Sequence, residues 1–562
     1  MHYDLKITGG TIVDGTGSPG YAGDVAVADG RIVALGRAPG EARATIDAKG
    51  RVVCPGFIDI HTHYDAQIVW DPLLSISPWH GVTTAIMGNC GFSIAPTPND
   101  RRDLMLRTLE RVEGMSLEAL RTGVRADWPI ESFPAYLDAI EKRGILINVG
   151  AYIGHTPVRI TVMGEDAVKR HATRDEIKAM AKIVREANEA GAVGFTTSMT
   201  KTQFAYDGHP IPSRLSDWTE VEMLVAAAAA GGGRVLQNSP GSLEAVEVFS
   251  LLAGKYDLAY TWTAILAGLD GPGSHRRFLD EAHKRVERGL RVYPQTSPQP
   301  QQFEFTFDAP IVFDRNDLFA ATRKTDHAGR LAIYRDLEFR RRFKGLVFDG
   351  FDVLLNDWTE RAVITHAPTE PALAERTLGA VAAERGLDPV DLALDLSLAS
   401  DLNARFRLDV VNFDRAEVGE ILNDPVGVVA FSDAGAHASQ LCNANYTTHI
   451  MQHWVRETGV LKLEQAVWML TARPAEVMGL TDRGKLATGM AADIVVFDPK
   501  TIGASKLRRV NDLPAGAPRV VVDAFGIDAV IVNGRIVRRN GEAVVQAGDK
   551  LPGKLLRGAK AA

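Results

Sequence analysis

Short apolar runs separated by turn residues open the chain. Between residues 3 and 54, runs such as 24–27 and 31–35 alternate with glycines and with Asp-Gly or Gly-Gly pairs, a pattern typical of strands joined by tight turns. The C-terminal part has the same pattern of short apolar runs and turn residues, with runs at residues 492–497 and 530–537. Neither end is long enough to enclose a core by itself. We therefore expect residues 1–55 and 481–562 to form one small β-sandwich domain together.

The middle of the chain, residues 56–480, has longer repeating units than the two ends. Apolar strand-like runs alternate with helical stretches such as residues 174–189, which place Ile177, Met180 and Val184 on one face. The strand-like runs lie at residues 57–60, 83–87, 145–149, 193–195, 234–236, 258–262, 290–293, 361–364 and 428–431. This alternation predicts an α/β fold, a TIM-like (β/α)8 barrel with catalytic groups at the C-terminal ends of its strands. Nine candidate strands exceed the eight of such a barrel, so at least one of them is not a barrel strand.

One segment, at about residues 296–350, interrupts the alternation. A loop rich in proline and glutamine is followed by Phe303, Phe305, Phe307 and Phe313 and then by a basic helical stretch at residues 339–344. We expect an insertion near the mouth of the barrel. Two interpretations stay open, namely a lid over the site and a surface excursion without a catalytic part.

Residues that can bind a metal ion follow three of the predicted barrel strands. His61 and His63 lie two residues apart at the end of the first strand, so both imidazoles point to the same face. Cys90 lies in a Gly-Asn-Cys-Gly sequence, and a thiolate is a strong zinc ligand. Asp433 follows the last strand, where a carboxylate can bind a metal and accept a proton from water. Each residue alone is more often structural, but together they predict a hydrolytic metal site.

These segments resemble the amidohydrolase superfamily, and within it the N-acyl-D-amino-acid deacylase (D-aminoacylase) branch. The matching motifs lie at residues 55–63, 80–84, 88–91, 154–159, 191–195, 293–294, 432–433, 482–486 and 489–495. The resemblance implies a zinc enzyme in which His61, His63 and Asp433 bind the metal. It also implies that Cys90 reaches the metal in place of a carboxylated lysine, and that Asp433 acts as general base and then as general acid.

Two departures from that branch change the expected site. The segments that usually supply histidines from the fifth and sixth strands correspond here to residues 235–240 and 259–264, which contain none. We therefore expect one Zn2+ ion rather than two. Cys90 is favoured as the fourth ligand over Gln237 or Asn238, because amides are weak zinc ligands.

The groups that the resemblance implies for a substrate carboxylate are also missing. The sixth-strand lysine is absent, and no arginine occurs at residues 434–440. Gln295, Gln299 and the phenylalanines of the insertion favour a neutral, partly apolar substrate over a free N-acyl-D-amino acid. The candidate substrate-binding residues are Tyr293, Trp262, His437, His155 and Asn238.

The predicted function is the hydrolysis of an amide, or of a cyclic amide or ester, by a metal-dependent amidohydrolase. Asp433 takes a proton from water and returns it to the leaving group. Three alternatives stay open: an N-acyl-D-amino-acid deacylase proper, a catalytically degenerate barrel that only binds a ligand, and a metal-assisted lyase.

Composition limits the partners. The 562 residues are 46% apolar and 24% charged, as in a soluble globular protein, and the net charge of -7 disfavours a nucleic-acid surface. Three cysteines cannot form a disulfide framework, and the first residues do not resemble a signal peptide, so we expect a cytoplasmic protein. No apolar run is long enough to span a bilayer. We expect a small-molecule substrate, with no nucleic-acid or membrane partner, and homo-oligomerisation stays open.

Overall fold

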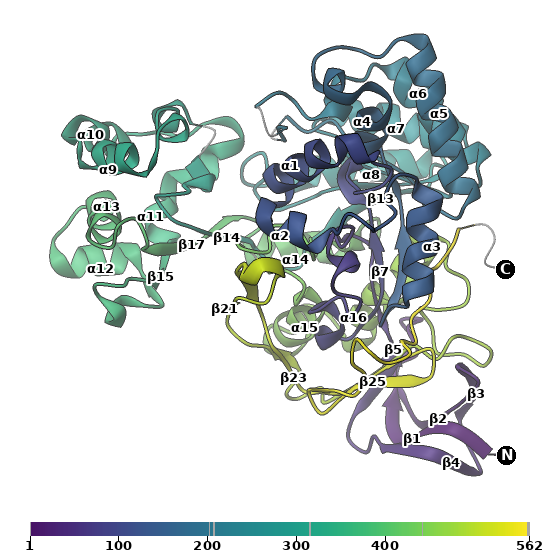
Figure 1. The fold of residues 1–562 in the computed structure, drawn as a ribbon. Helices are drawn as coiled ribbons and strands as arrows, with labels where there is room; N and C mark the ends of the chain where they lie inside the picture. Colours follow the sequence, from purple (N-terminus) through teal and green to yellow (C-terminus); the bar gives the residue numbers. More distant parts are fainter. Residues whose placement is uncertain (1, 202, 206–207, 314–315, 441, 559–562) are drawn as a thin grey trace. The chain divides into compact units, whose positions relative to one another are not determined.

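The computed structural model describes residues 2–201, 203–205, 208–313, 316–440 and 442–558 (Figure 1). The chain forms two compact units. Unit 1 comprises Met1–Ile265, Phe278–Pro298 and Leu422–Ala562, and unit 2 comprises Leu266–Arg277 and Gln299–Ile421. Among the described residues, no helix combines the length and the apolar character that a bilayer span needs.

One nine-stranded sheet of unit 1 is built from both ends of the chain. Its strands are β1 (His2–Ile12), β2 (Tyr21–Ala28), β3 (Arg31–Gly36), β4 (Glu41–Asp47), β5 (Val52–Pro55), β19 (Ile494–Phe497), β24 (Ile527–Val532), β25 (Arg535–Arg539) and β26 (Glu542–Ala543). The two ends meet where β5 pairs with β19 in antiparallel orientation, and the purple and yellow strands lie together in Figure 1. Ile7, Val25, Ile494 and Ile531 share one buried core. The two ends therefore form one sheet because each has apolar side chains that it could not bury alone.

Two parallel ladders form the centre of unit 1. The first contains β6 (Phe57–Asp59), β7 (Val82–Met87) and β8 (Asn148–Ala151). The second contains, in spatial order, β18 (Val428–Val429), β13 (Val292–Thr296), β12 (Ala259–Thr263), β11 (Val235–Ser239), β10 (Gly194–Ser198) and β9 (Ile153–Gly154). The α/β class is confirmed. The described residues do not show the closed barrel that we predicted, because β6 and β18 are short and a single bridge, Thr62 to Ala434, connects their ends.

Helices alternate with these strands. Those of unit 1 include α1 (Arg102–Glu113), α2 (Leu117–Gly123), α3 (Phe133–Arg143), α4 (His155–Met163), α5 (Arg174–Glu189), α6 (Trp218–Ala230), α7 (Leu243–Lys255), α15 (Tyr446–His449), α16 (Leu463–Leu470) and α17 (Ala472–Met478). Two more, α8 (Ser274–Glu287) and α14 (Arg415–Asn423), include residues of both units. Helix α5 confirms the predicted helix at residues 174–189. A capping box starts it, in which Thr173 and Glu176 each accept a hydrogen bond from the other's backbone N–H.

The C-terminal part adds short elements to unit 1. A π-helix at Ile450–Glu457 continues α15. Two small antiparallel sheets are formed by β20 (Gly503–Ala504) with β23 (Ala524–Phe525), and by β21 (Arg508–Val510) with β22 (Arg519–Val521).

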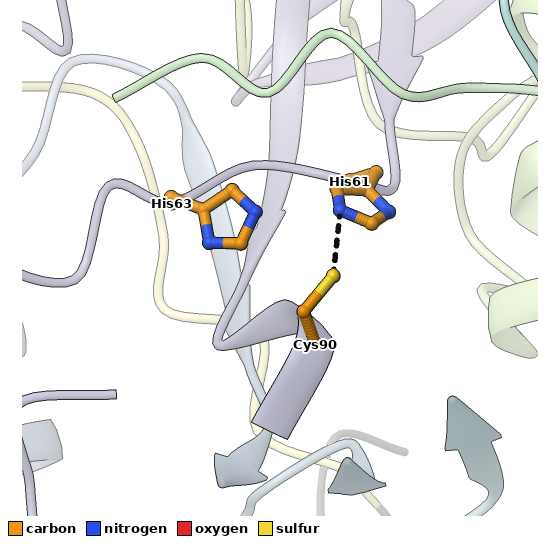
Figure 2. Close-up of side chains that lie close together, drawn as sticks. All are labelled: His61, His63 and Cys90. Carbon is orange, nitrogen blue, oxygen red and sulfur yellow. Dashed lines mark hydrogen bonds between the residues drawn. The ribbon is translucent and has the colours of Figure 1, made fainter. Parts of the chain in front are cut away.

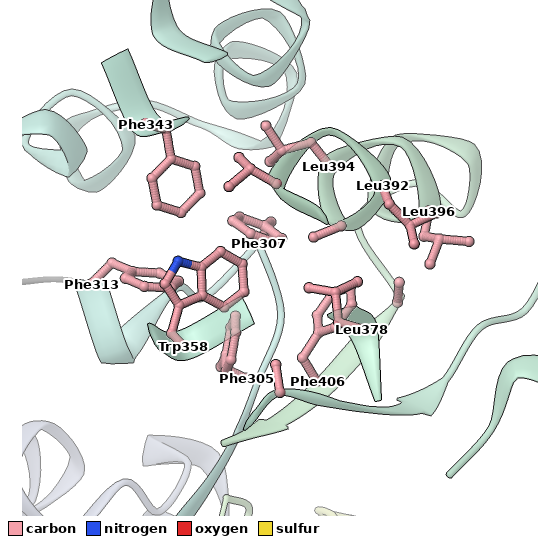
Figure 3. Packing of buried hydrophobic residues seen from close by; sticks show 14 of the residues in the cluster. Phe305, Phe307, Phe313, Phe343, Trp358, Leu378, Leu392, Leu394, Leu396 and Phe406 are labelled. Atoms are coloured by element: carbon pink, nitrogen blue, oxygen red, sulfur yellow. The ribbon is translucent and has the colours of Figure 1, made fainter. Parts of the chain in front are cut away.

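Unit 2 has an aromatic core of its own (Figure 3). Its main elements are β14 (Gln301–Phe305), α9 (His327–Arg335), α10 (Leu337–Lys344), α11 (Trp358–Arg361), β15 (Val363–His366), β16 (Arg376–Thr377), α12 (Leu378–Arg385), α13 (Pro389–Ala399) and β17 (Arg405–Val411). Phe343 stacks on Trp358 with ring centroids 5.6 Å apart, and Phe313 meets Trp358 edge-on at 5.1 Å. The predicted insertion at about residues 296–350 lies largely in this unit, which extends to Ile421.

Unit 2 corrects two sequence-based expectations. Residues 361–364, a candidate barrel strand, contribute to β15, which pairs in antiparallel orientation with β16 and β17. This run is therefore the candidate in excess of eight. Phe305, Phe307 and Phe313, which we expected to favour an apolar ligand, are buried in the core of unit 2, because adjacent aromatic rings there cover one another.

Candidate metal centre

His61, His63 and Cys90 form one buried cluster in unit 1 (Figure 2). Each residue offers one ligand atom, and these atoms all lie within 4.8 Å of one another. The two imidazole centroids are 5.3 Å apart, and Sγ of Cys90 lies 3.3 Å from Nε2 of His61. Strand β6 ends at Asp59, so both histidines follow the strand instead of belonging to it as we predicted. Their side chains nevertheless converge.

Asp433 completes this group from the other end of the sequence. Its Oδ1 atom lies 3.2 Å from Nε2 of His61 and 3.5 Å from Nε2 of His63. The backbone N–H of His63 donates to the carbonyl of Ala434 at 2.7 Å, and Ser432 Oγ donates to the carbonyl of His61 at 3.2 Å. These bonds join the segment after β6 to the segment after β18. The carboxylate is thus held against both imidazoles.

The glycines around Cys90 explain how the loop presents its thiol. Cys90 has a left-handed backbone (φ 56°) in a short turn after β7. A Cβ atom on Gly88 would lie 2.6 Å from the carbonyl oxygen of Tyr152, so the loop can lie this close to the chain between β8 and β9 only with glycine. The N–H of Cys90 donates to Oε1 of Gln237 at 2.8 Å, and Ser239 Oγ donates to the thiol sulfur at 3.2 Å.

Three neutral side chains surround the cluster. Nδ1 of His61 donates to Oε1 of Gln295 at 2.5 Å, and Thr263 Oγ1 lies 3.3 Å from the same nitrogen. Gln237 donates from Nε2 to Thr263 at 3.0 Å. Gln237 and Thr263 lie on β11 and β12, in the two segments where proteins of the resembling branch usually have histidines.

The sequence patterns indicated no role for Thr263 or Ser239, and they left Gln237 and Asn238 as alternative ligands. Successive side chains along a strand point to opposite faces, so Gln237 and Asn238 face opposite sides of the sheet. Val235 and Ala259 lie in the same buried core as Ile58 and Ile60. Counting by twos from these residues places Gln237, Ser239 and Thr263 on that inner face.

Asn238 and Trp262 lie on the opposite face. Asn238 accepts a hydrogen bond from the hydroxyl of Tyr260 at 2.7 Å, and Trp262 stacks on that ring with centroids 5.5 Å apart. The structure therefore does not bring these two predicted substrate-binding residues to the cluster.

The other candidates for substrate contacts have different surroundings. His155 is fully buried, and its ring nitrogens lie 2.8 Å from Thr197 Oγ1 and 2.8 Å from Glu220 Oε1, so both are used within the protein. Tyr293 packs against the inner core and under the guanidinium of Arg473, at 4.8 Å. His437 lies near enough for its charge to lower the pKa of Asp433. Only His437 of these three interacts with the cluster.

Burial and neighbouring charge set the protonation of the donors. Burial raises the pKa of the Cys90 thiol, but His61 and His63 outweigh it and lower that pKa to about 6. Burial also raises the pKa of Asp433. This effect is outweighed by a hydrogen bond from His63 and by the charges of His61 and His63, so the pKa of Asp433 lies below its usual range. Asp59, which accepts from the N–H of His61, has its pKa raised to about 7 by burial. The cluster thus offers a thiolate and a carboxylate near neutral pH.

Two pockets adjoin the cluster. The first includes His63, Phe92, Leu109, Met115 and Leu120, and its cavity volume is about 10 Å³, which is room for about one water molecule. The second includes Tyr64, Ser432, Asp433 and Arg519, and its cavity volume is about 30 Å³.

Comparisons with known proteins agree with this geometry. Residues 44–538 match the amidohydrolase family. N-acyl-D-glutamate deacylase from Alcaligenes xylosoxydans xylosoxydans is 30% identical over 547 residues, which cover 94% of this chain and 93% of that protein. A solved N-acyl-D-glutamate deacylase from Bordetella bronchiseptica, complexed with zinc and a phosphonate inhibitor, is 28% identical over 99% of this chain and 100% of that one, with a TM-score of 0.68. A solved D-aminoacylase is 25% identical over 99% of this chain and 100% of that one, with a TM-score of 0.67. That enzyme has a binuclear metal centre, with one-metal activation and second-metal attenuation.

Proposed function

We propose, from the premise that this chain belongs to the amidohydrolase family, that it hydrolyses an amide, or a cyclic amide or ester, in a neutral and partly apolar substrate. The chain belongs to the N-acyl-D-amino-acid deacylase branch of that family, and it is a metal-dependent hydrolase of C–N bonds. The observation that carries the proposal is the contact of Asp433 with both His61 and His63.

The donor set fits zinc. Two imidazoles, a thiolate and a carboxylate are the ligands that zinc prefers, and burial shields them from water. We propose a single ion, because the positions facing the cluster from β11 and β12 are the neutral Gln237 and Thr263, which bond to each other. The solved D-aminoacylase has a binuclear metal centre with one-metal activation and second-metal attenuation, so the single-ion proposal departs from that relative in the number of ions.

Bound zinc would supply Lewis-acid activation of water and of the scissile carbonyl. Asp433 is the general base, since its lowered pKa keeps it ionised near neutral pH and its Oδ1 atom faces both imidazoles. After accepting a proton at Oδ1, the same group returns it to the leaving nitrogen or oxygen. Gln295 holds His61 so that Nε2 faces the other donors.

The fold supports these roles in one further way. We infer that the two parallel ladders are arcs of one (β/α)8 barrel within residues 56–480. Tyr152 alone separates β8 from β9, and the bridge between Thr62 and Ala434 lies where the other two edges meet. The sheet formed by residues 1–55 and 481–562 is then the β-sandwich domain of the resemblance.

The charge around the cluster supports a neutral substrate. Arg519 lines the second pocket, but its guanidinium bonds to Asp512 at 2.7 and 2.8 Å and to the carbonyl of Ser75 at 3.0 Å. These partners compensate its charge. If a substrate carboxylate instead displaces Asp512, the chain is an N-acyl-D-amino-acid deacylase proper, as the names of its relatives suggest.

A matched pair of substrates tests the proposal. We would measure kcat/KM of the zinc-loaded protein for N-acetyl-D-leucine and for its methylamide, with hydantoins and lactones beside them. We expect at least a tenfold preference for the neutral member. A preference for the free acid would identify a deacylase proper. Absence of turnover in protein that holds zinc would favour the degenerate barrel, and products lacking label from 18O-water would identify a lyase.

A further inference from the structure

The sulfur of Cys90 lies between an imidazole and a hydroxyl. Nε2 of His61 lies 3.3 Å from it on one side (Figure 2), and Ser239 Oγ on β11 donates to it at 3.2 Å. We propose that Thr196 and Ser239 are positioning residues for Cys90. Thr196 fixes the turn that presents the thiol, and the hydroxyl of Ser239 occupies the β11 side of the sulfur, so that the thiolate binds one ion as a terminal ligand and does not bridge two. The inference rests on the proposed single-zinc hydrolase and adds to it the residues that decide how its thiolate binds.

Strand β10 holds the turn around Cys90 from both sides. Thr196 Oγ1 donates to the carbonyl of Gly88 at 2.6 Å and accepts the N–H of Gly91 at 3.1 Å. A hydroxyl can donate and accept at once, so one side chain bonds the residues that flank the Asn-Cys pair. A Cβ atom on Gly91 would lie 3.0 Å from Cα of Thr197, which shows how closely the turn packs on the strand. Thr196 therefore sets the position of the turn relative to β10.

The middle of the turn is fixed by bonds to other segments. Nδ2 of Asn89 donates to the carbonyl of Thr62 at 3.2 Å and to that of Ile86 at 3.0 Å. The N–H of Cys90 donates to Oε1 of Gln237 at 2.8 Å. Every residue of the turn thus bonds to a neighbouring segment or strand, and the direction of the thiol is set by the protein before an ion binds.

Ser239 is itself held in place. The register of β10 and β11 pairs it with Ser198, and its carbonyl accepts the N–H of Met199 at 2.8 Å. Ser239 is 6% exposed, and within the part of the chain that the structure describes its hydroxyl makes one hydrogen bond, to the Cys90 sulfur. A hydroxyl has a single proton to donate. That proton is committed to the sulfur.

A donor at this position changes what the sulfur can bind. A hydrogen bond draws electron density from a thiolate, which lowers the energy of the sulfur lone pairs and weakens their attraction for a second cation. The neighbouring Gln237 is neutral and donates to Thr263 at 3.0 Å, so it brings no negative charge to this side of the thiol. The β11 side of Cys90 therefore favours a hydroxyl over a second ion.

Substitution of cobalt(II) for zinc gives this inference a spectroscopic test. A cobalt–thiolate bond has a sulfur-to-metal charge-transfer band, and the energy of that band falls when the sulfur loses a hydrogen-bond donor. In Ser239→Ala we expect the band to move to longer wavelength. Ser239→Thr keeps the hydroxyl and should restore the wild-type position. An unchanged band in Ser239→Ala would overturn the role of Ser239.

A cobalt titration tests the terminal binding of the thiolate. In the wild type we expect the intensity of the charge-transfer band to saturate at about one equivalent of cobalt per chain. An intensity that continues to rise to about two equivalents would show that a second ion binds the same sulfur, and the proposal would be wrong.

Ser198→Ala is the matched control for Ser239→Ala. Ser198 is the register partner of Ser239 and is also buried, but its hydroxyl donates to Oε1 of Gln203 at 2.7 Å. This variant should leave the charge-transfer band at the wild-type position. A shift equal to that of Ser239→Ala would show a general effect of disturbing the ends of these strands, and would contradict the proposal.

Thr196→Val tests the hold on the turn. Valine keeps the branched shape but removes both bonds to the turn, so we expect about a tenfold loss of cobalt affinity. Thr197, the next residue, faces away and bonds to His155 at 2.8 Å. Thr197→Val should therefore leave the affinity within about threefold. Equal losses in the two variants would reject the role of Thr196.

These readouts need no turnover, so they separate this inference from the proposed function. A band that shifts in Ser239→Ala, in protein that hydrolyses none of the tested amides, would keep the positioning role and reject the hydrolase proposal. Hydrolysis by a protein whose band ignores Ser239 would reject the positioning role alone. A wild type without a charge-transfer band would show that Cys90 is not a ligand, and would reject this inference.

Discussion

Nδ1 of His61 donates a hydrogen bond to Oε1 of Gln295 over 2.5 Å, and this bond fixes the imidazole tautomer. An amide oxygen only accepts, so a proton lies on Nδ1, which leaves Nε2, beside Cys90 and Asp433, as the nitrogen that could bind a metal. Partners of this kind orient metal ligands and raise their basicity. Two segments remote in sequence, β13 and the segment after β6, thus cooperate in preparing one ligand.

Replacement of Gln295 should therefore weaken metal binding. In Gln295→Ala we expect about a 10- to 100-fold loss of zinc affinity, measured by competition with a chromophoric chelator. Gln295→Glu retains an acceptor and should recover most of the affinity. Asn238→Ala, whose side chain lies on the opposite face of β11, serves as the control and should leave the affinity within about threefold. Equal losses in the Gln295→Ala and Asn238→Ala variants would show a general structural effect instead.

Asp433→Asn should separate proton transfer from folding. The amide keeps the size of the carboxylate but accepts no proton at neutral pH, so kcat should fall by about 10²- to 10⁴-fold. Zinc content, measured on the purified variant, should remain above half an equivalent because His61, His63 and Cys90 are unchanged. A variant with nearly wild-type kcat would remove Asp433 from the proposed mechanism.

Metal stoichiometry offers a test of the inner face of β11 and β12. The wild type should bind about one zinc ion per chain. The double variant Gln237→His with Thr263→His introduces two imidazoles facing the cluster and should raise this to about two. Asn238→His with Trp262→His places the same residues on the opposite face and should leave the count at one. Two ions in the wild type would contradict the single-ion proposal.

His80 should make stability depend on pH. Its ring bonds to Thr448 and to the carbonyl of Val522, and burial lowers the pKa of His80 to about 4. The unfolded chain takes up a proton below its ordinary pKa of about 6.5, whereas the folded chain does not until about pH 4, so acidification favours unfolding. This group should cost on the order of 3 kcal/mol between pH 6.5 and pH 4.

Urea unfolding at several pH values would measure that effect. His80→Gln should be less stable at pH 7 but should lose less stability between pH 6.5 and pH 4 than the wild type. Parallel pH profiles for the two proteins would show that His80 does not contribute.

The aromatic core of unit 2 should be separable from the metal centre. Trp358→Ala removes the ring that stacks on Phe343 and should destabilise unit 2 by about 3–5 kcal/mol. Zinc content should be unchanged, because His61, His63, Cys90 and Asp433 all lie in unit 1. Leu337→Ala, at a residue 80% exposed, is the matched control and should change neither quantity. Loss of zinc in Trp358→Ala would contradict this independence.

Local signals in the sequence predicted the features that depend on nearby residues. The α/β alternation, the helix at residues 174–189 and the short strands at both ends follow from short-range spacing and turn chemistry. The candidates His61, His63, Cys90 and Asp433 could be picked out because each follows an apolar run, and the structure brings their donor atoms together. What a strand or a turn requires is largely contained within a few residues.

The tertiary structure alone decided which side chains face the cluster and which runs share a sheet. Residues 361–364 satisfy a strand pattern, yet only their antiparallel partners place them in unit 2. Gln237 and Asn238 are neighbours of the same type, and only the registers of β10, β11 and β12 turn one toward Cys90 and the other toward Tyr260. The bond from His61 to Gln295 and the contact of Asp433 with both histidines join segments far apart in the chain. Such relationships arise from long-range packing, which short apolar patterns do not encode.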